Sequence, residues 1–290
     1  MKKIALTLFC LLLLAKTYAQ NNNSLLWQIS GNGLKAPSYL FGTYHLAGKS
    51  LVDSLPEIGK RFNTCKTVVG EVLVDSTVAT KLVSYMIAPE GATLDKIFTP
   101  QEYRQIYKFF NQFTDVDTSS KAFDHFKPTA IATIIAVLIA PKTISATNPA
   151  LDTYFQQEGK GRNDNVIGLE TAEQQADMLF NAPMADQKKQ LLAYVKKKDQ
   201  LKADAIKGYQ MYLRQDLEGI TKSFEDNDDW TPEQAEKLLK KRNLNWMTQL
   251  PAIMQRQPTF IAVGAGHLVG DYGLIKQLRL KGYKVTPVKI

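Results

Sequence analysis

Two of the three histidines in this 290-residue chain lie in copies of one short pattern. The pattern reads G-x-x-H-L-x-G and occupies residues 42–48 and again residues 264–270. An apolar run comes directly before the first glycine of each copy, as in YLFGTYH and FIAVGAGH. Because histidine is scarce here and the pattern is repeated, we expect a shared chemical role for His45 and His267, although about 220 residues separate them.

Two further apolar runs also reach a glycine and are then followed closely by a glutamate. VVGE ends in Glu71, and VIGLE ends in Glu170. The carboxyl ends of parallel strands open on one edge of a sheet, where ligands bind. Glycine lets the chain turn sharply out of the sheet at such a point. If the four runs are parallel neighbours, two imidazoles and two carboxylates meet in one pocket.

Such a set suits two kinds of hydrolytic chemistry. Imidazole nitrogen and carboxylate oxygen bind zinc, manganese, cobalt or iron, and a metal-bound water can attack an amide or ester carbonyl. For this case we predict His45, His267 and Glu71 as the metal ligands. Alternatively, a histidine oriented by a carboxylate acts as a general base without any metal.

We predict catalytic roles for Glu71, Glu170 and Arg242. The glutamates serve as metal ligands or as the general base in this reading. Arg242, in KKRNLNWM, lies on a helix before the last motif strand and can hold a carboxylate or an oxyanion in bidentate fashion. Each also has a structural alternative: Glu170 can complement a helix dipole, and Arg242 can form a surface ion pair.

Neighbouring residues receive structural interpretations. His125 lies between aromatic residues in AFDHFKP, which favours a packed or capping role. Tyr44 and Trp246 can line the pocket, but we interpret both as core residues. Cys65 is the only cysteine after residue 19, so no internal disulfide is expected and a buried thiol is the default.

The elements that must position these side chains follow from the hydrophobic pattern. Strand-like runs occur at residues 25–30, 38–45, 66–74, 166–170, 259–267 and 283–290. Helical patterns dominate residues 77–158 and 183–257. The final strand–helix–strand unit has the length of a βαβ crossover, which predicts parallel pairing. We predict an α/β fold with a mixed, largely parallel sheet and a large helical insertion.

Three helix starts carry recognisable capping residues. Threonine–proline pairs open helices at residues 99–100 and 231–232, and Glu102 stands in capping-box position after the first. Another helix begins near Thr171. The apolar segment at residues 130–140 is too short to span a bilayer and is predicted to be a buried helix.

The N-terminal segment at residues 1–19 has a basic start, an apolar middle and small residues at its end, the pattern of a secretory signal peptide. We therefore predict a single exported domain at residues 20–290, in the periplasm or outside the cell, with neither a lipid anchor nor stable membrane insertion. Removing three lysines lowers the net charge from +8 to +5. The remaining charge is spread over helices, so we expect no nucleic-acid partner.

The blocks LFGTYHLAG, VVGEV, VIGLETAEQQ, KKRNLNW and FIAVGAGHLVGDYGLIKQLRLKGYKVTPV resemble successive blocks of the TraB/GumN family. The resemblance covers almost the whole chain after residue 24 and is most specific at the C-terminal block. It implies hydrolase-like chemistry, because the more distant Tiki members are described as metal-dependent proteases with paired G-x-x-H motifs. Their motif residues correspond to His45, His267 and Glu71, with Glu170 and Arg242 matching the later blocks.

Three functions follow from these observations. The leading one is an exported hydrolase that uses a divalent metal ion, either manganese, cobalt, zinc or iron, to cleave a peptide bond. The second is a module of the same fold that binds haem, iron or a peptide without turnover. The third is a metal-independent esterase with one of the paired histidines as general base. The substrate is a peptide or a small molecule, and the sequence leaves its identity and the oligomeric state open.

Overall fold

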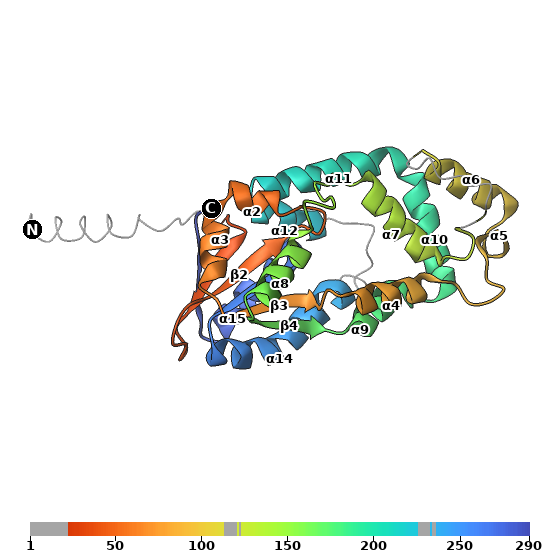
Figure 1. Ribbon diagram of the computed structural model, residues 1–290. Coiled ribbons are helices and arrows are strands. Elements are labelled where there is room, and N and C mark those ends of the chain that lie inside the picture. The colour runs from red at the N-terminus through yellow and green to blue at the C-terminus, as the bar shows by residue number, and fades with distance from the viewer. Residues whose placement is uncertain (1–22, 113–120, 122, 226–232, 234–235) are drawn as a thin grey trace, which may run out of the picture.

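The computed structural model describes residues 23–112, 121, 123–225, 233 and 236–290, which Figure 1 shows. The sheet and the helices beside it form one end of the molecule, and helices from the middle of the chain form the other. The predicted signal peptide at residues 1–19 and the predicted helix start at Thr231 and Pro232 lie outside the described residues.

A six-stranded sheet organises the fold, with strand order β4-β3-β5-β2-β1-β6. Its strands are β1 (Leu26–Ser30), β2 (Ser38–Thr43), β3 (Thr67–Val72), β4 (Asn165–Glu170), β5 (Thr259–Gly264) and β6 (Lys284–Pro287). Neighbours among β4, β3, β5 and β2 pair in parallel, whereas β1 pairs antiparallel with both β2 and β6. The sheet is therefore mixed and largely parallel, which confirms the predicted α/β class.

The last strand pairs differently from the prediction. The C-terminal strand–helix–strand unit led us to expect β5 and β6 as directly paired parallel strands. Instead, β6 pairs antiparallel with β1, with Val285 opposite Ile29. β6 still runs in the same direction as β5, but β2 and β1 lie between them. The prediction of direct pairing is wrong because the N-terminal hairpin of β1 and β2 occupies the edge of β5 that β6 would need.

Helices next to the sheet bury its apolar side chains. They are α2 (Ser50–Ser54), α3 (Pro56–Asn63), α8 (Leu151–Gly161), α14 (Lys241–Arg256) and α15 (Leu274–Leu280). The Phe155 ring of α8 contacts Phe260 of β5 with a centroid distance of 4.8 Å, and Phe62 of α3 contacts the same ring at 5.2 Å. Cys65 is fully buried in this core, as predicted.

The helical insertion occupies two long connections, one from β3 to β4 and one from β4 to β5. Outside the helices next to the sheet, these connections contain α4 (Ser76–Met86), α5 (Leu94–Ile97), α6 (Pro100–Phe110), α7 (Pro128–Ile139), α9 (Ala172–Phe180), α10 (Met184–Lys196), α11 (Lys198–Leu213), α12 (Leu217–Glu225) and the π-helical turn η2 (Glu236–Lys240). The insertion has its own apolar cluster, separate from that of the sheet. Its presence confirms the predicted large helical insertion.

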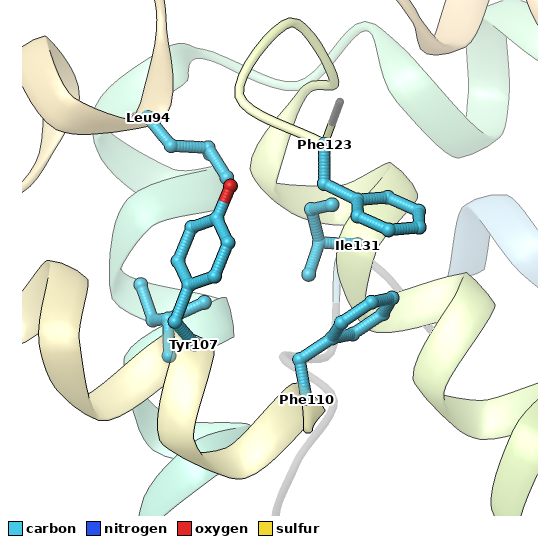
Figure 2. A pocket seen from close by; sticks show the side chains of 6 residues that line it. Leu94, Tyr107, Phe110, Phe123 and Ile131 are labelled. Atoms are coloured by element: carbon cyan, nitrogen blue, oxygen red, sulfur yellow. The ribbon is translucent and has the colours of Figure 1, made fainter. Parts of the chain in front are cut away.

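The apolar cluster of the insertion includes the helix predicted from residues 130–140. Ile131 of α7, together with Leu94, Phe110 and Phe123, lines a small apolar cavity, which Figure 2 shows. Tyr107 also lines this cavity and points its hydroxyl group away from α6. Among the described residues, no helix is long and apolar enough to cross a membrane.

Local capping explains where two of the predicted helices begin. The Thr99 hydroxyl accepts a hydrogen bond from the Glu102 N–H, and the Glu102 carboxylate accepts one from the Thr99 N–H. Thr171 and Gln174 form the same reciprocal pair at the start of α9. These bonds satisfy backbone donors that a helix start leaves without intrahelical partners. Both starts were predicted at these threonines.

Candidate functional site

The four predicted side chains lie at the same edge of the sheet, at the carboxyl ends of its four parallel strands. Glu71 lies near the end of β3, and Glu170 is the last residue of β4. His45 follows β2 by two residues, and His267 lies in the short helix η3 (Ala265–Leu268) directly after β5. The side-by-side order of these strands places all four residues at one edge, as their spacing in the sequence led us to expect.

Arg242 connects three of these side chains. Its Nε donates to Glu170 Oε1 and Oε2 at 2.9 and 3.1 Å. Its Nη2 donates to Glu71 Oε2 at 2.5 Å, and its Nη1 lies 2.9 Å from His267 Nε2. Only 11% of the Arg242 side chain is exposed, and the carboxylates are similarly buried. Arg242 therefore forms buried ion pairs, and not the surface ion pair that was its structural alternative.

Helix α14 presents two further residues to the same network. Asn243 Oδ1 lies 2.7 Å from His267 Nδ1, and Asn243 Nδ2 donates to the His267 carbonyl at 3.1 Å. If Nδ1 carries the proton, Nε2 keeps the lone pair that accepts from Arg242. Trp246 is fully buried, as predicted, yet its Nε1 also donates to Glu170 Oε1 at 3.0 Å.

His45 belongs to a second, more exposed arrangement. Its Nδ1 lies 3.0 Å from Asp152 Oδ2, and the other carboxylate oxygen of Asp152 accepts from the Thr43 hydroxyl at 2.9 Å. This fixes the carboxylate, which in turn orients the imidazole. The His45 side chain is 63% exposed, whereas that of His267 is 6% exposed. Of the two motif histidines, His45 is therefore the one that solvent and a substrate can reach.

Gly264 allows the two arrangements to approach each other. A Cβ atom at this position would lie 3.2 Å from Glu71 Oε1 and 3.3 Å from His45 Nε2. The Gly264 N–H donates to the same Glu71 oxygen at 2.7 Å. Gly264, the first glycine of the second motif, therefore lets the His45 and Glu71 side chains lie close to each other. The Cβ atom of any other residue at position 264 would lie in tight contact with both.

The electrostatics separate the roles of the two histidines. The Asp152 carboxylate raises the pKa of His45 to about 9, although solvent around the exposed ring screens part of this interaction. Burial lowers the pKa of His267 to about 3, so its imidazole is neutral. Burial by itself raises the pKa of Glu71, but the nearby imidazoles and Arg242 outweigh it and lower that pKa to about 2. Glu71 is therefore ionised.

These shifts predict that the folded chain is most stable near pH 6.5, the ordinary pKa of histidine. Below this pH the unfolded chain binds a proton at His267 that the folded chain does not, so the free energy of unfolding falls by about 1.4 kcal/mol per pH unit. Glu71 adds to the loss below its ordinary value of 4.5. Above pH 6.5 the folded chain retains a proton on His45 that the unfolded chain has lost, so stability also falls toward pH 9.

Urea unfolding across this pH range measures the effect. In His267→Gln the acid side of the profile should become flatter between pH 5 and 6.5, because, of the two motif histidines, only His267 is protonated there in the unfolded chain but not in the folded chain. An acid side that is equally steep in His267→Gln and in the parent would contradict the assignment.

A family model described as the TraB/PrgY/gumN family matches residues 25–287, most of the chain. The chain belongs to the TraB/PrgY/gumN family. This confirms the resemblance seen in the motif blocks, and it places all of the site residues described above within the matched region.

Three named relatives of this chain are distant from it in sequence. It is 25% identical to Metalloprotease TIKI2 of Danio rerio, with 91% of this chain and 60% of that protein aligned. It is 23% identical to Metalloprotease TIKI homolog of Amphimedon queenslandica, with 92% and 62% aligned, and 23% identical to Metalloprotease TIKI1 of Xenopus tropicalis, with 91% and 61% aligned. The chain thus spans about three fifths of the length of these relatives. No solved structure gives a significant match.

The names of these relatives suggest a divalent metal, and the side chains around Arg242 allow this to be tested. The predicted ligand atoms Glu71 Oε1 and His267 Nε2 lie 3.7 Å apart. However, Glu71 Oε1 already accepts from the Gly264 N–H, and His267 Nε2 faces Arg242. In the described part of the chain, no group of three or more histidine, cysteine, aspartate or glutamate residues is placed to hold a metal ion. As arranged here, the predicted ligands do not fit a metal.

Sequence reasoning missed Asp152 and Asn243. Asp152 lies in the first turn of α8, about 100 residues from His45, and a lone aspartate in that position resembles an ordinary helix-start residue. Asn243 directly follows Arg242 in the block KKRNLNW, and that adjacency was a usable indication. The structural alternative for Glu170, in which it complements a helix dipole, did not anticipate the ion pair that Glu170 forms with Arg242.

His125 and Tyr44 take no part in this network. The His125 side chain is exposed, and the N-cap of α7 is Lys127 without a side-chain capping bond, so the structure shows neither the packed nor the capping role predicted for His125. The His125 carbonyl accepts from the Ala88 N–H at 2.8 Å. Tyr44 packs against Tyr209 and Tyr212, with centroid distances of 5.2 and 5.6 Å. Its hydroxyl donates to the Pro141 carbonyl at 3.0 Å, so the expected packing role of Tyr44 agrees with the structure.

Proposed function

We propose that the chain is an exported hydrolase that cleaves an acyl bond, preferably a peptide bond, at the carboxyl edge of its sheet. The observation that carries this proposal is the pair formed by His45 and Asp152, 3.0 Å apart, with the imidazole ring open to solvent. The metalloprotease names of the distant relatives support the class of bond. Because the predicted metal ligands do not form a ligand group here, no step of the proposal passes through a metal.

In the proposed reaction, neutral His45 takes a proton from a water molecule at Nε2, and the water oxygen attacks the carbonyl carbon of the substrate. Asp152 accepts a hydrogen bond from Nδ1–H and stabilises the imidazolium that forms. The imidazolium then gives its proton to the leaving amine or alcohol as the tetrahedral intermediate collapses. His45 returns to its neutral form.

Arg242 acts in this proposal as a positioning residue. Its three guanidinium nitrogen atoms contact Glu170, Glu71 and His267. These contacts fix Glu71, which accepts from Gly264 beside His45. The predicted contact between Arg242 and a substrate oxyanion would require one of these hydrogen bonds to break.

The test is hydrolysis of a mixed peptide library, read by mass spectrometry, and of aryl esters, read by absorbance. The purified protein is assayed after exhaustive chelation and again with added manganese, cobalt or zinc. Cleavage that persists after chelation supports the proposed steps. Cleavage that appears only with added metal contradicts them, and the absence of any cleavage contradicts the proposal of a hydrolase.

Asp152→Asn should change the pH dependence of this hydrolysis. Asp152 raises the pKa of His45, so its neutral replacement lowers that pKa and moves the rising limb of kcat/KM toward lower pH. Loss of the carboxylate that orients the imidazole should also reduce kcat at high pH, by up to about 10⁴-fold. The profile is measured from pH 5 to 10 beside Asp95→Asn, an exposed aspartate of α5. An unmoved limb in Asp152→Asn would show that His45 is not the base.

Export is a separate part of the proposal. Residues 1–19 have the composition of a signal peptide, and they would direct the chain out of the cytoplasm before removal. N-terminal sequencing of the protein from a periplasmic or culture fraction should give a chain that starts at Gln20. Recovery of the chain with residues 1–19 intact, and only from the cytoplasm, would contradict this assignment.

A further inference from the structure

Three buried donor groups converge on Arg242. The Glu71, Glu170 and His267 side chains are 8%, 6% and 6% exposed. Carboxylate oxygen and a neutral imidazole nitrogen are the donors that zinc, manganese and cobalt use in proteins. Here each of the three side chains instead faces a different nitrogen of a single guanidinium. The chemistry of the donors suits a metal, but a side-chain cation already lies among them.

The spacing of the donors matches a guanidinium and not an ion. A zinc ion needs its oxygen and nitrogen donors about 2.0–2.2 Å from its own centre. In this site the Glu71, Glu170 and His267 atoms lie 2.5, 2.9 and 2.9 Å from the outer nitrogens of Arg242, which places them further still from its central carbon. The three side chains are thus held apart by a planar cation with several donors.

Arg242 is also firmly held as a cation. Its Nη1 donates to the Leu238 carbonyl at 3.3 Å in addition to its contact with His267. A guanidinium does not lose its proton in proteins, so it cannot leave by becoming neutral. Its positive charge balances the charge of two buried carboxylates, as a bound metal ion would do at this position.

We propose that the Arg242 guanidinium takes the place of a divalent metal ion in this chain. It keeps the set formed by Glu71, Glu170 and His267 free of metal, and removal of the guanidinium converts that set into a metal site. This inference concerns binding alone, so it stands whether or not the chain is a hydrolase.

Cobalt(II) binding tests the proposal, because its visible absorption reports nitrogen and oxygen ligation and calorimetry gives the stoichiometry. Arg242→Ala should bind one cobalt ion per chain, at least about 100-fold more tightly than the parent. Arg242→Lys keeps a buried cation and is the matched control, which should bind as weakly as the parent. The double variant Arg242→Ala/His267→Gln should lose the cobalt band because one donor is gone.

Two results would overturn the proposal. One is stoichiometric cobalt binding by the parent that is lost in His267→Gln, since the guanidinium would then not exclude the ion. The other is a folded Arg242→Ala, judged by circular dichroism, that binds no cobalt. If Arg242→Ala is unfolded without metal, it and Arg242→Ser are refolded with and without cobalt. Failure of both variants to fold or to bind cobalt under either condition then counts as the second result.

Discussion

Replacing His45 with alanine should lower kcat for the proposed hydrolysis by about 10²- to 10⁴-fold, the usual contribution of a positioned general base. Stability near neutral pH should fall only slightly, because solvent screens the ion pair between the 63% exposed His45 side chain and Asp152, and Asp152 keeps its bond to Thr43. Single-turnover kinetics on the best-cleaved peptide or ester measures the first effect. A thermal melt near neutral pH measures the second.

His125→Ala is the matched control for this experiment. His125 is the third histidine of the chain, is exposed like His45, and lies in the turn before α7. Its removal should leave kcat unchanged. Full activity in His45→Ala would eliminate the proposed general base, and a large loss in both variants would indicate a general effect of losing a surface histidine.

The meeting of His45, Glu71, Glu170 and His267 was predictable because each residue stands at a fixed place relative to a strand. An apolar run that ends at a glycine predicts both the strand and the edge at which its next side chain emerges. Parallel strands then bring side chains together that are far apart in the sequence. This reasoning does not require knowing which helix residues contact these side chains.

The residues that contact these side chains were less predictable. They lie on helices, and a position on a helix does not fix which residue reaches the site in the way that the end of a strand does. Asp152 lies in the first turn of α8, where an acidic residue is common. Arg242, Asn243 and Trp246 share one turn of α14, and only the packing of that helix shows which of them reach the carboxylates. The predicted pairing of β5 with β6 was wrong for a similar reason. A hairpin inserted between β5 and β6 does not alter the hydrophobic pattern of either strand.

The buried network also explains why the metal prediction could not be resolved by residue type. His45, His267 and Glu71 are suitable ligands in any chain with these motifs. Whether they hold an ion depends on which other groups contact them, and in this structure Arg242 contacts two of the three, His267 and Glu71. The sequence named all of these residues, but it did not indicate that the arginine and the proposed ligands contact one another.

Glu71→Ala should lower the free energy of unfolding by about 3–5 kcal/mol, because it breaks a buried ion pair and leaves Arg242 with only Glu170 to balance its charge. The change also removes the acceptor of the Gly264 N–H, which is buried. Urea unfolding near pH 6.5 measures the loss.

Glu173→Ala is the matched control, since Glu173 also pairs with a cation, Lys81, but both side chains are exposed. Removing an exposed pair should change the free energy of unfolding very little, because solvent and salt screen it. Equal, small effects in the two variants would show that Arg242 finds other partners when Glu71 is absent. The network would then be adaptable, and the proposed exclusion of a metal by a firmly held guanidinium would lose its structural basis. A large loss confined to Glu71→Ala would instead mean that the carboxylates and the guanidinium stabilise the fold as one unit, beside the exposed imidazole to which we assign the chemistry.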